Sequence, residues 1–105
     1  MSRVAAIYVV YANWCPHCVP TAVEPIKKAG ERLGVPVRLL DIDTDDVEEA
    51  DDLVKKYGDW TPDYLIPQVF AKLDDGRMTH VLTGRPAGLV YTRKAVEDFV
   101  KSLTA

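Results

Sequence analysis

The sequence predicts a single α/β domain, residues 1–105, in which helices flank a mixed four-stranded sheet in the order β-α-β-α-β-β-α. The chain has 105 residues, 48% of them hydrophobic, which suits one domain with its own core. Two apolar segments are each followed by a helical pattern, so their strands are expected to be parallel. Two more apolar segments flank a short turn and add an antiparallel pair before a last helical pattern.

The first strand and helix are predicted over the N-terminal third of the chain. Val4–Tyr11 (VAAIYVVY) is almost continuously apolar, as expected for a strand buried on both faces. Pro16 suits the first turn of the helix that follows, and Gly34 is a typical stop. Pro20 and Pro25 each remove a backbone hydrogen bond inside this helix. The helix is therefore expected to be kinked.

A second strand and helix follow. Val35–Ile42 (VPVRLLDI) is predicted to be a buried strand, and residues 43–58 show helical periodicity. Acidic residues crowd the first turns and Lys55 and Lys56 lie in the last, which is the charge order that the helix dipole favours. Some of these acids alternate as in a calcium loop, but Asp46 stands where the turn glycine is needed. We therefore interpret them as a solvated helix start.

A hairpin and a helix complete the domain. Pro67–Leu73 and Met78–Leu82 flank the turn Asp74-Asp75-Gly76 and predict two antiparallel strands. Thr92 is expected to cap the last helix. The inward positions of that helix are Ala95, Val96, Phe99, Val100 and Leu103.

Composition excludes several classes of function. The net charge is −3 and the basic residues are scattered, which argues against a nucleic-acid interface. The longest apolar run, Val4–Ala12, has nine residues, whereas a membrane helix needs about 20. Its β-branched and aromatic content is typical of a strand and not of an export signal. We therefore expect a cytoplasmic protein, in a compartment where thiols are kept reduced.

Cys15 and Cys18 are the two cysteines of the chain, and three uses compete for them. A disulfide that closes so short a loop stabilises the fold little. A structural zinc needs four ligands, and beyond the cysteines only His17 and His80 are left. Thiol–disulfide exchange fits better, because the start of a helix stabilises a thiolate and two intervening residues let the sulfurs meet. We predict a redox pair and no metal site.

Several motifs together resemble the thioredoxin superfamily. They are WCPHC after a buried strand, LDID ending the next strand, IPQVF before the DDG turn, and Gly84 after the last strand. The resemblance extends from about Val4 to Leu103 and implies a minimal thioredoxin fold. A CxxC motif that opens a helix, combined with Ile-Pro before the third strand, is a specific signal.

The resemblance also implies roles for the residues around the cysteines. Cys15 would be the nucleophile and Cys18 the resolving cysteine, and Trp14 matches the tryptophan that precedes the pair. Pro16 and His17 would tune the pKa of the Cys15 thiol. A histidine here can stabilise the thiolate, which makes the disulfide a stronger oxidant. We expect a pair that is more oxidising than that of thioredoxin.

Three further positions would bind substrate if the resemblance holds. Pro67 matches the cis-proline of the family, and X–Pro bonds are those for which cis is accessible. Ile66 before it would offer backbone hydrogen bonds to a bound chain, and Gly84 would keep the substrate groove open. Trp60 and Tyr64, in the loop Asp59–Leu65, could shape this groove or plug the end of the sheet.

Some positions depart from the patterns of the family. No strand and helix precede the cysteine-bearing strand, which is closer to glutaredoxins than to thioredoxins. Val9 stands where thioredoxins carry a buried aspartate. Ala12 replaces a lysine of glutaredoxins, and Thr83-Gly84-Arg85-Pro86 replaces their glutathione-binding segment. These departures argue against dependence on glutathione.

The sequence thus predicts a monomeric thiol–disulfide oxidoreductase that reduces or exchanges protein disulfides through Cys15 and Cys18. No bound cofactor is implied, and a partner reductase or a thiol pool would supply electrons. The alternatives are a glutathione-dependent glutaredoxin-like enzyme, a non-catalytic binding domain that uses the groove beside Pro67, and a dimer that binds metal.

Overall fold

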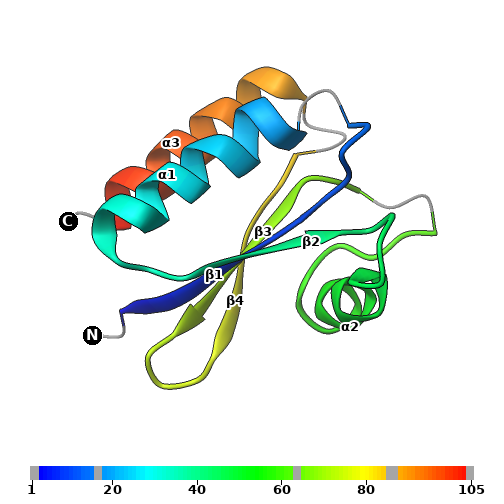
Figure 1. Ribbon diagram of the computed structural model, residues 1–105, viewed down its shortest axis with the longest axis horizontal. Helices are drawn as coiled ribbons and strands as arrows, with labels where there is room; N and C mark the ends of the chain where they lie inside the picture. Colours follow the sequence, from blue (N-terminus) through cyan, green and yellow to red (C-terminus); the bar gives the residue numbers. More distant parts are fainter. Residues whose placement is uncertain (1–2, 16–17, 63–64, 85–87, 104–105) are drawn as a thin grey trace.

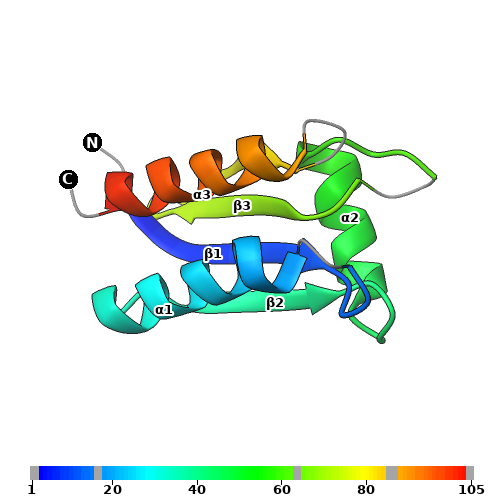
Figure 2. The ribbon, with the colours of Figure 1, turned by 90° about the horizontal axis from the view of Figure 1, so that it is seen from above.

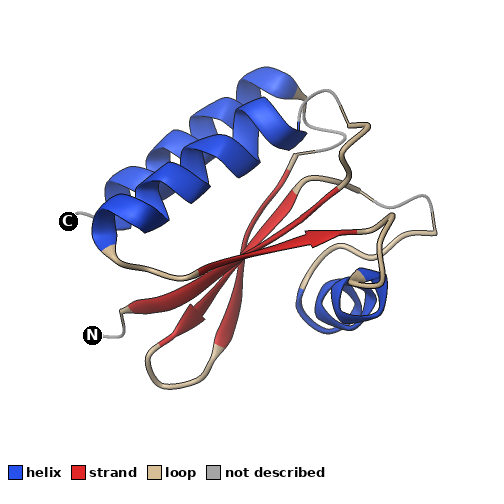
Figure 3. Cartoon of the chain, viewed as in Figure 1, coloured by secondary structure: helices blue, strands red, loops and turns tan. Residues whose placement is uncertain are grey.

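The computed structural model describes residues 3–15, 18–62, 65–84 and 88–103. It has three layers, with the sheet between helices on both of its faces (Figure 3). Two helices lie side by side on one face, and a single helix covers the other (Figures 1 and 2). This α/β arrangement, with its mixed four-stranded sheet, is consistent with a minimal thioredoxin-like fold. The predicted fold class is confirmed.

The strands are β1 (Val4–Tyr11), β2 (Val37–Asp41), β3 (Gln68–Leu73) and β4 (Met78–Thr83), and their order across the sheet is β2-β1-β3-β4. β1 is parallel to β2 and antiparallel to β3, and β4 completes the hairpin at one edge, as predicted. The register pairs Tyr11 with Asp41, Val10 with Gln68, and Gln68 with Thr83. Four strand ends therefore meet at one end of the sheet.

The helices are η1 (Val19–Val23), α1 (Glu24–Leu33), α2 (Val47–Tyr57) and α3 (Leu89–Leu103). The interruption expected at the prolines takes the form of a π-helical turn, η1, in which the N–H of Glu24 reaches the carbonyl of Val19. The next residue, Pro25, has no N–H to donate, so the backbone cannot keep its regular ladder here. α1 ends at Gly34, which has a φ of 72° and provides the predicted stop.

The predicted start of the last helix is wrong. α3 begins at Leu89, and Thr92 lies inside it and does not cap it. Gly88, with a φ of 98°, lies directly before the helix, four residues ahead of the expected cap. The Thr92 hydroxyl lies 2.7 Å from the carbonyl oxygen of Gly88 and 3.2 Å from that of Gly84. It therefore anchors the helix start to the chain that leaves β4.

Each face of the sheet carries its own hydrophobic core. We call the first the α2-side core, and its buried residues are Val10, Ala12, Cys15, Cys18, Leu40, Ala50, Leu53, Val54, Ile66 and Phe70. We call the second the α1/α3-side core, and its buried residues are Ile7, Val9, Ala22, Val23, Ile26, Val69, Leu82 and Val96. The inward positions predicted for the last helix pack against this second core. Within the described part of the chain, every helix is too short or too polar to span a membrane.

Candidate functional site

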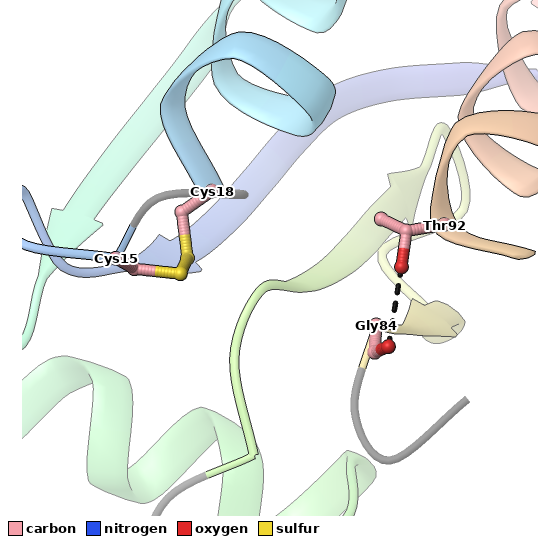
Figure 4. The surroundings of a disulfide bond; sticks show 4 residues. All are labelled: Cys15, Cys18, Gly84 and Thr92. Carbon is pink, nitrogen blue, oxygen red and sulfur yellow. Dashed lines mark hydrogen bonds between the residues drawn. A yellow bond between two sulfur atoms is a disulfide. The ribbon is translucent and has the colours of Figure 1, made fainter. Parts of the chain in front are cut away.

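Cys15 and Cys18 form a disulfide at the end of the sheet where the strand ends meet (Figure 4). Cys15 follows a turn after β1, in which its N–H donates to the carbonyl of Ala12 at 3.0 Å. Cys18 is the N-cap residue of η1. The two Cα atoms are 5.4 Å apart, so the strand–turn–helix geometry brings the sulfurs together as the spacing predicted.

The two cysteines differ in their access to solvent. Cys18 is fully buried, whereas Cys15 keeps 4% of its surface exposed. Trp14, directly before it, is 61% exposed. A thiol arriving from outside therefore meets Cys15 first, beside an exposed aromatic ring. Pro16 and His17, which were predicted to tune the pKa, lie outside the described residues.

The Ile66–Pro67 peptide bond is cis, in agreement with the expectation from the resemblance. Ile66 is fully buried and belongs to the same α2-side core as both cysteines. One of the residues expected to receive substrate, Ile66, therefore shares a core with the disulfide.

Gly84 packs directly against Pro67. Its N–H donates to the Pro67 carbonyl at 2.8 Å. A Cβ at Gly84 would lie 2.8 Å from Pro67 Cδ and 2.8 Å from the Thr92 hydroxyl oxygen. No other residue fits without displacing Pro67 or α3. The disulfide and the pair Gly84–Thr92 lie on opposite sides of the chain that leads into β3 (Figure 4).

A hydrogen-bonded pair that sequence analysis missed anchors the cysteine turn. Asn13 Nδ2 donates to Asp41 Oδ2 at 2.7 Å, and the N–H of Asp43 donates to Asp41 Oδ1 at 2.9 Å. Asp41 is only 5% exposed and ends β2 beside Tyr11. Burial raises the pKa of Tyr11, and the negative charges of Asp41 and Asp46 raise it further. The only sign of this hydrogen-bonded pair in the sequence is an aspartate that ends an apolar strand.

A second missed residue is Gln68, which follows Pro67. It is fully buried, and its side chain bonds to backbone groups at both ends of the loop Asp59–Leu65. Trp60 in this loop is 39% exposed, and the residues named for the two cores do not include it. Tyr64, the other residue predicted to shape a groove, lies outside the described part of the chain.

His80, which the metal-binding alternative would use as a ligand, makes other contacts. His80 Nε2 lies 2.6 Å from the Thr83 hydroxyl oxygen, and its ring meets the edge of Phe70 with centroids 5.5 Å apart. Among the described residues, no group of three or more His, Cys, Asp or Glu side chains could hold a metal ion.

Comparison of the chain with protein-family models, with curated proteins and with solved structures finds no match in any of the three.

Proposed function

We propose that the chain is a thiol–disulfide oxidoreductase that acts on protein disulfides through Cys15 and Cys18. The observation that carries this proposal is the placement of the disulfide. It lies at the start of a helix, Cys15 keeps 4% of its surface exposed beside Trp14, and both cysteines belong to the same core as the residue before a cis-proline. A disulfide that served only to stabilise the fold would close a longer loop.

The reduced form would act in two steps. The Cys15 thiolate attacks one sulfur of a substrate disulfide, which breaks that bond and releases one substrate thiolate. A mixed disulfide then joins Cys15 to the substrate. The Cys18 thiolate attacks the Cys15 sulfur, forms the Cys15–Cys18 disulfide and releases the second substrate thiolate. The substrate gains two electrons and, at neutral pH, two protons, and the enzyme loses two electrons.

The local structure supports Cys15 as the attacking group. The disulfide lies at the start of the helix that begins with η1, and the positive end of a helix dipole favours an anion, which lowers the pKa of a thiol. Cys18 is fully buried, so it reaches only a sulfur already bonded to Cys15. The turn is held on its other side by the hydrogen bond between Asn13 and Asp41. The thiolate would thus form at a fixed position.

Pro67 and Ile66 would bind the substrate chain, beside the disulfide with which Ile66 packs. Because Gly84 has no side chain, Pro67 can stay in this position without a clash. No bound cofactor is needed, because the electrons pass between sulfur atoms. A monomer in the cytoplasm, re-reduced by a partner reductase or by a thiol pool, fits this chemistry.

The first test is the reduction potential of the pair, measured by equilibration in glutathione redox buffers and trapping of free thiols. We expect one two-electron transition. A value near about −270 mV would indicate a reductase, and a value near about −120 mV an oxidant. If no intramolecular disulfide forms in any buffer, the proposal is wrong and a binding role takes its place.

Two variants test the order of the steps. With Cys15→Ser, dithiothreitol should reduce insulin only at the uncatalysed rate. Cys18→Ser should instead accumulate a mixed disulfide with the substrate, visible by mass spectrometry. The same assay with glutathione and glutathione reductase tests the glutaredoxin alternative, which requires turnover with glutathione as the electron donor.

A further inference from the structure

Gln68 is a fully buried polar side chain in which every donor is used. Its Nε2 donates to the carbonyl of Asp59 at 3.0 Å and to that of Leu65 at 2.8 Å. Its Oε1 accepts from the N–H of Asp59 at 3.1 Å. One side chain therefore joins the two ends of the loop between α2 and the cis-proline.

A buried amide is an expensive way to fill a core position. It costs free energy unless its hydrogen bonds are made, whereas an aliphatic side chain of similar size packs there without that requirement. Among the described residues, the side-chain hydrogen bonds of Gln68 go to the backbone of the loop. Their effect is to fix the path of the loop.

Two further contacts hold the start of the loop. Asp59 Oδ2 accepts from the Thr83 hydroxyl at 2.7 Å, which attaches the loop to the end of β4. At Gly58, a Cβ would meet Gln68 Oε1 and would lie 2.6 Å from the Phe70 ring. The chain can approach Gln68 this closely only because residue 58 is glycine. Asp59 is thus held through both its backbone and its side chain.

The segment that these contacts hold carries an exposed aromatic ring. Trp60 is 39% exposed, and the ammonium of Lys55 lies 4.6 Å from its ring centroid. Gln68 is adjacent to Pro67, and its strand pairs with the strand that leads to the cysteine turn. The loop after α2 and the turn after β1 lie at the same end of the molecule (Figure 1).

We propose that the segment Asp59–Pro62 is a docking arm for protein substrates, with Trp60 as its contact residue and Gln68 as the residue that positions it. The occupant is an extended segment of a disulfide-bonded protein, which lies along Pro67 and places an apolar side chain on the indole ring. Aromatic rings held in a fixed place provide contact area at a low cost in entropy. This inference depends on the proposed function and adds a preference for protein disulfides over small ones.

Trp60→Ala tests the contact. We expect KM for insulin to rise about five- to tenfold, as for the loss of an interface anchor, with kcat unchanged. The rate with the small substrate hydroxyethyl disulfide should stay the same, because it is too short to reach the arm. Tyr57→Ala is the matched control: it removes another exposed aromatic ring, which lies with Tyr8 and Met78 and not on the arm.

Gln68→Met tests the positioning role, since it keeps the volume and removes the hydrogen bonds. KM for insulin should rise by a similar factor, and the double variant with Trp60→Ala should show little additional loss, because both changes act through one contact. If Gln68→Met does not fold, Trp60→Ala still decides the question.

The outcomes separate this inference from the function on which it depends. If Trp60→Ala leaves KM for insulin unchanged, or affects both substrates equally, the docking arm is wrong and the oxidoreductase stands. If the unaltered protein reduces neither substrate, or if Cys15→Ser still reduces both, the proposed function fails and the arm fails with it.

Discussion

The two faces of the sheet carry cores with different contents. The α1/α3-side core is aliphatic throughout its buried residues and contains none of the candidate site residues. The α2-side core contains both cysteines and Ile66. The two cores share strands, so a residue of β1 that points to one face alternates with one that points to the other.

Because of this difference, we expect the stability of the fold and the chemistry of the thiols to respond differently to changes on the two faces. Packing on the α1/α3 side supports the sheet, and the cluster of buried residues there does not include the cysteines. Packing on the α2 side supports the sheet and also surrounds the sulfurs. Because the stability of the reduced form relative to the oxidised form sets the reduction potential, changes next to the sulfurs on the α2 side should alter both properties. Changes on the other side should affect both forms equally and alter stability alone.

Val9 and Val10 give the most direct test, because they are neighbours on β1, both fully buried, and one belongs to each core. Val9→Ala and Val10→Ala should each lower the free energy of unfolding by about 2–3 kcal/mol, through lost burial and a residual cavity. Only Val10→Ala should shift the reduction potential. Urea unfolding of the oxidised form and equilibration in glutathione buffers measure the two effects. Equal shifts in potential for both variants would contradict the separation.

Gly84→Ala tests the junction between the cis-proline and α3. The added methyl meets Pro67 Cδ and the Thr92 hydroxyl, so we expect a loss of about 1–3 kcal/mol from overpacking. Because Pro67 must move, KM for insulin should also rise. Gly76→Ala, in the hairpin turn where the φ of 91° is strained for alanine but space is open, is the control. It should cost stability without changing KM.

Asn13→Ala tests the anchor of the cysteine turn. It removes the hydrogen bond to Asp41 and should cost about 1 kcal/mol. Because the freed turn positions Cys15 less well, the rate constant for attack on a small disulfide should fall as well. Thr79→Val, which removes a hydrogen bond to the carbonyl of Ala71 away from the site, provides the comparison. If both variants keep the wild-type rate, the anchor has no role in the chemistry.

The element order and the meeting of the two cysteines could be predicted, because they depend on local patterns. Apolar runs, helical spacing and the turn residues determine where strands and helices form. The start of α3 was missed, because the left-handed conformation of Gly88 that begins it competes with a threonine that is an equally good cap by sequence.

The contacts of Asn13 and Gln68 could not be predicted for another reason. They depend on the register that sets Tyr11 beside Asp41 and on the path by which a loop returns to the sheet. A buried polar residue has no characteristic period, so its partners become evident only when the strands are paired.

The smallest effect concerns Tyr11, which packs against both cores. Burial, then the charges of Asp41 and Asp46, raise its pKa above the ordinary 10.0 in the folded protein. The folded state therefore holds the phenolic proton more tightly than the unfolded chain, and this contribution to stability is complete below pH 10 and is lost as the pH rises through the folded-state pKa. In the oxidised protein, where no thiol titrates, the free energy of unfolding should fall more steeply above pH 10 for the wild type than for Tyr11→Phe. Parallel curves for the two proteins would show that burial and these charges do not raise the pKa of Tyr11 in the folded state.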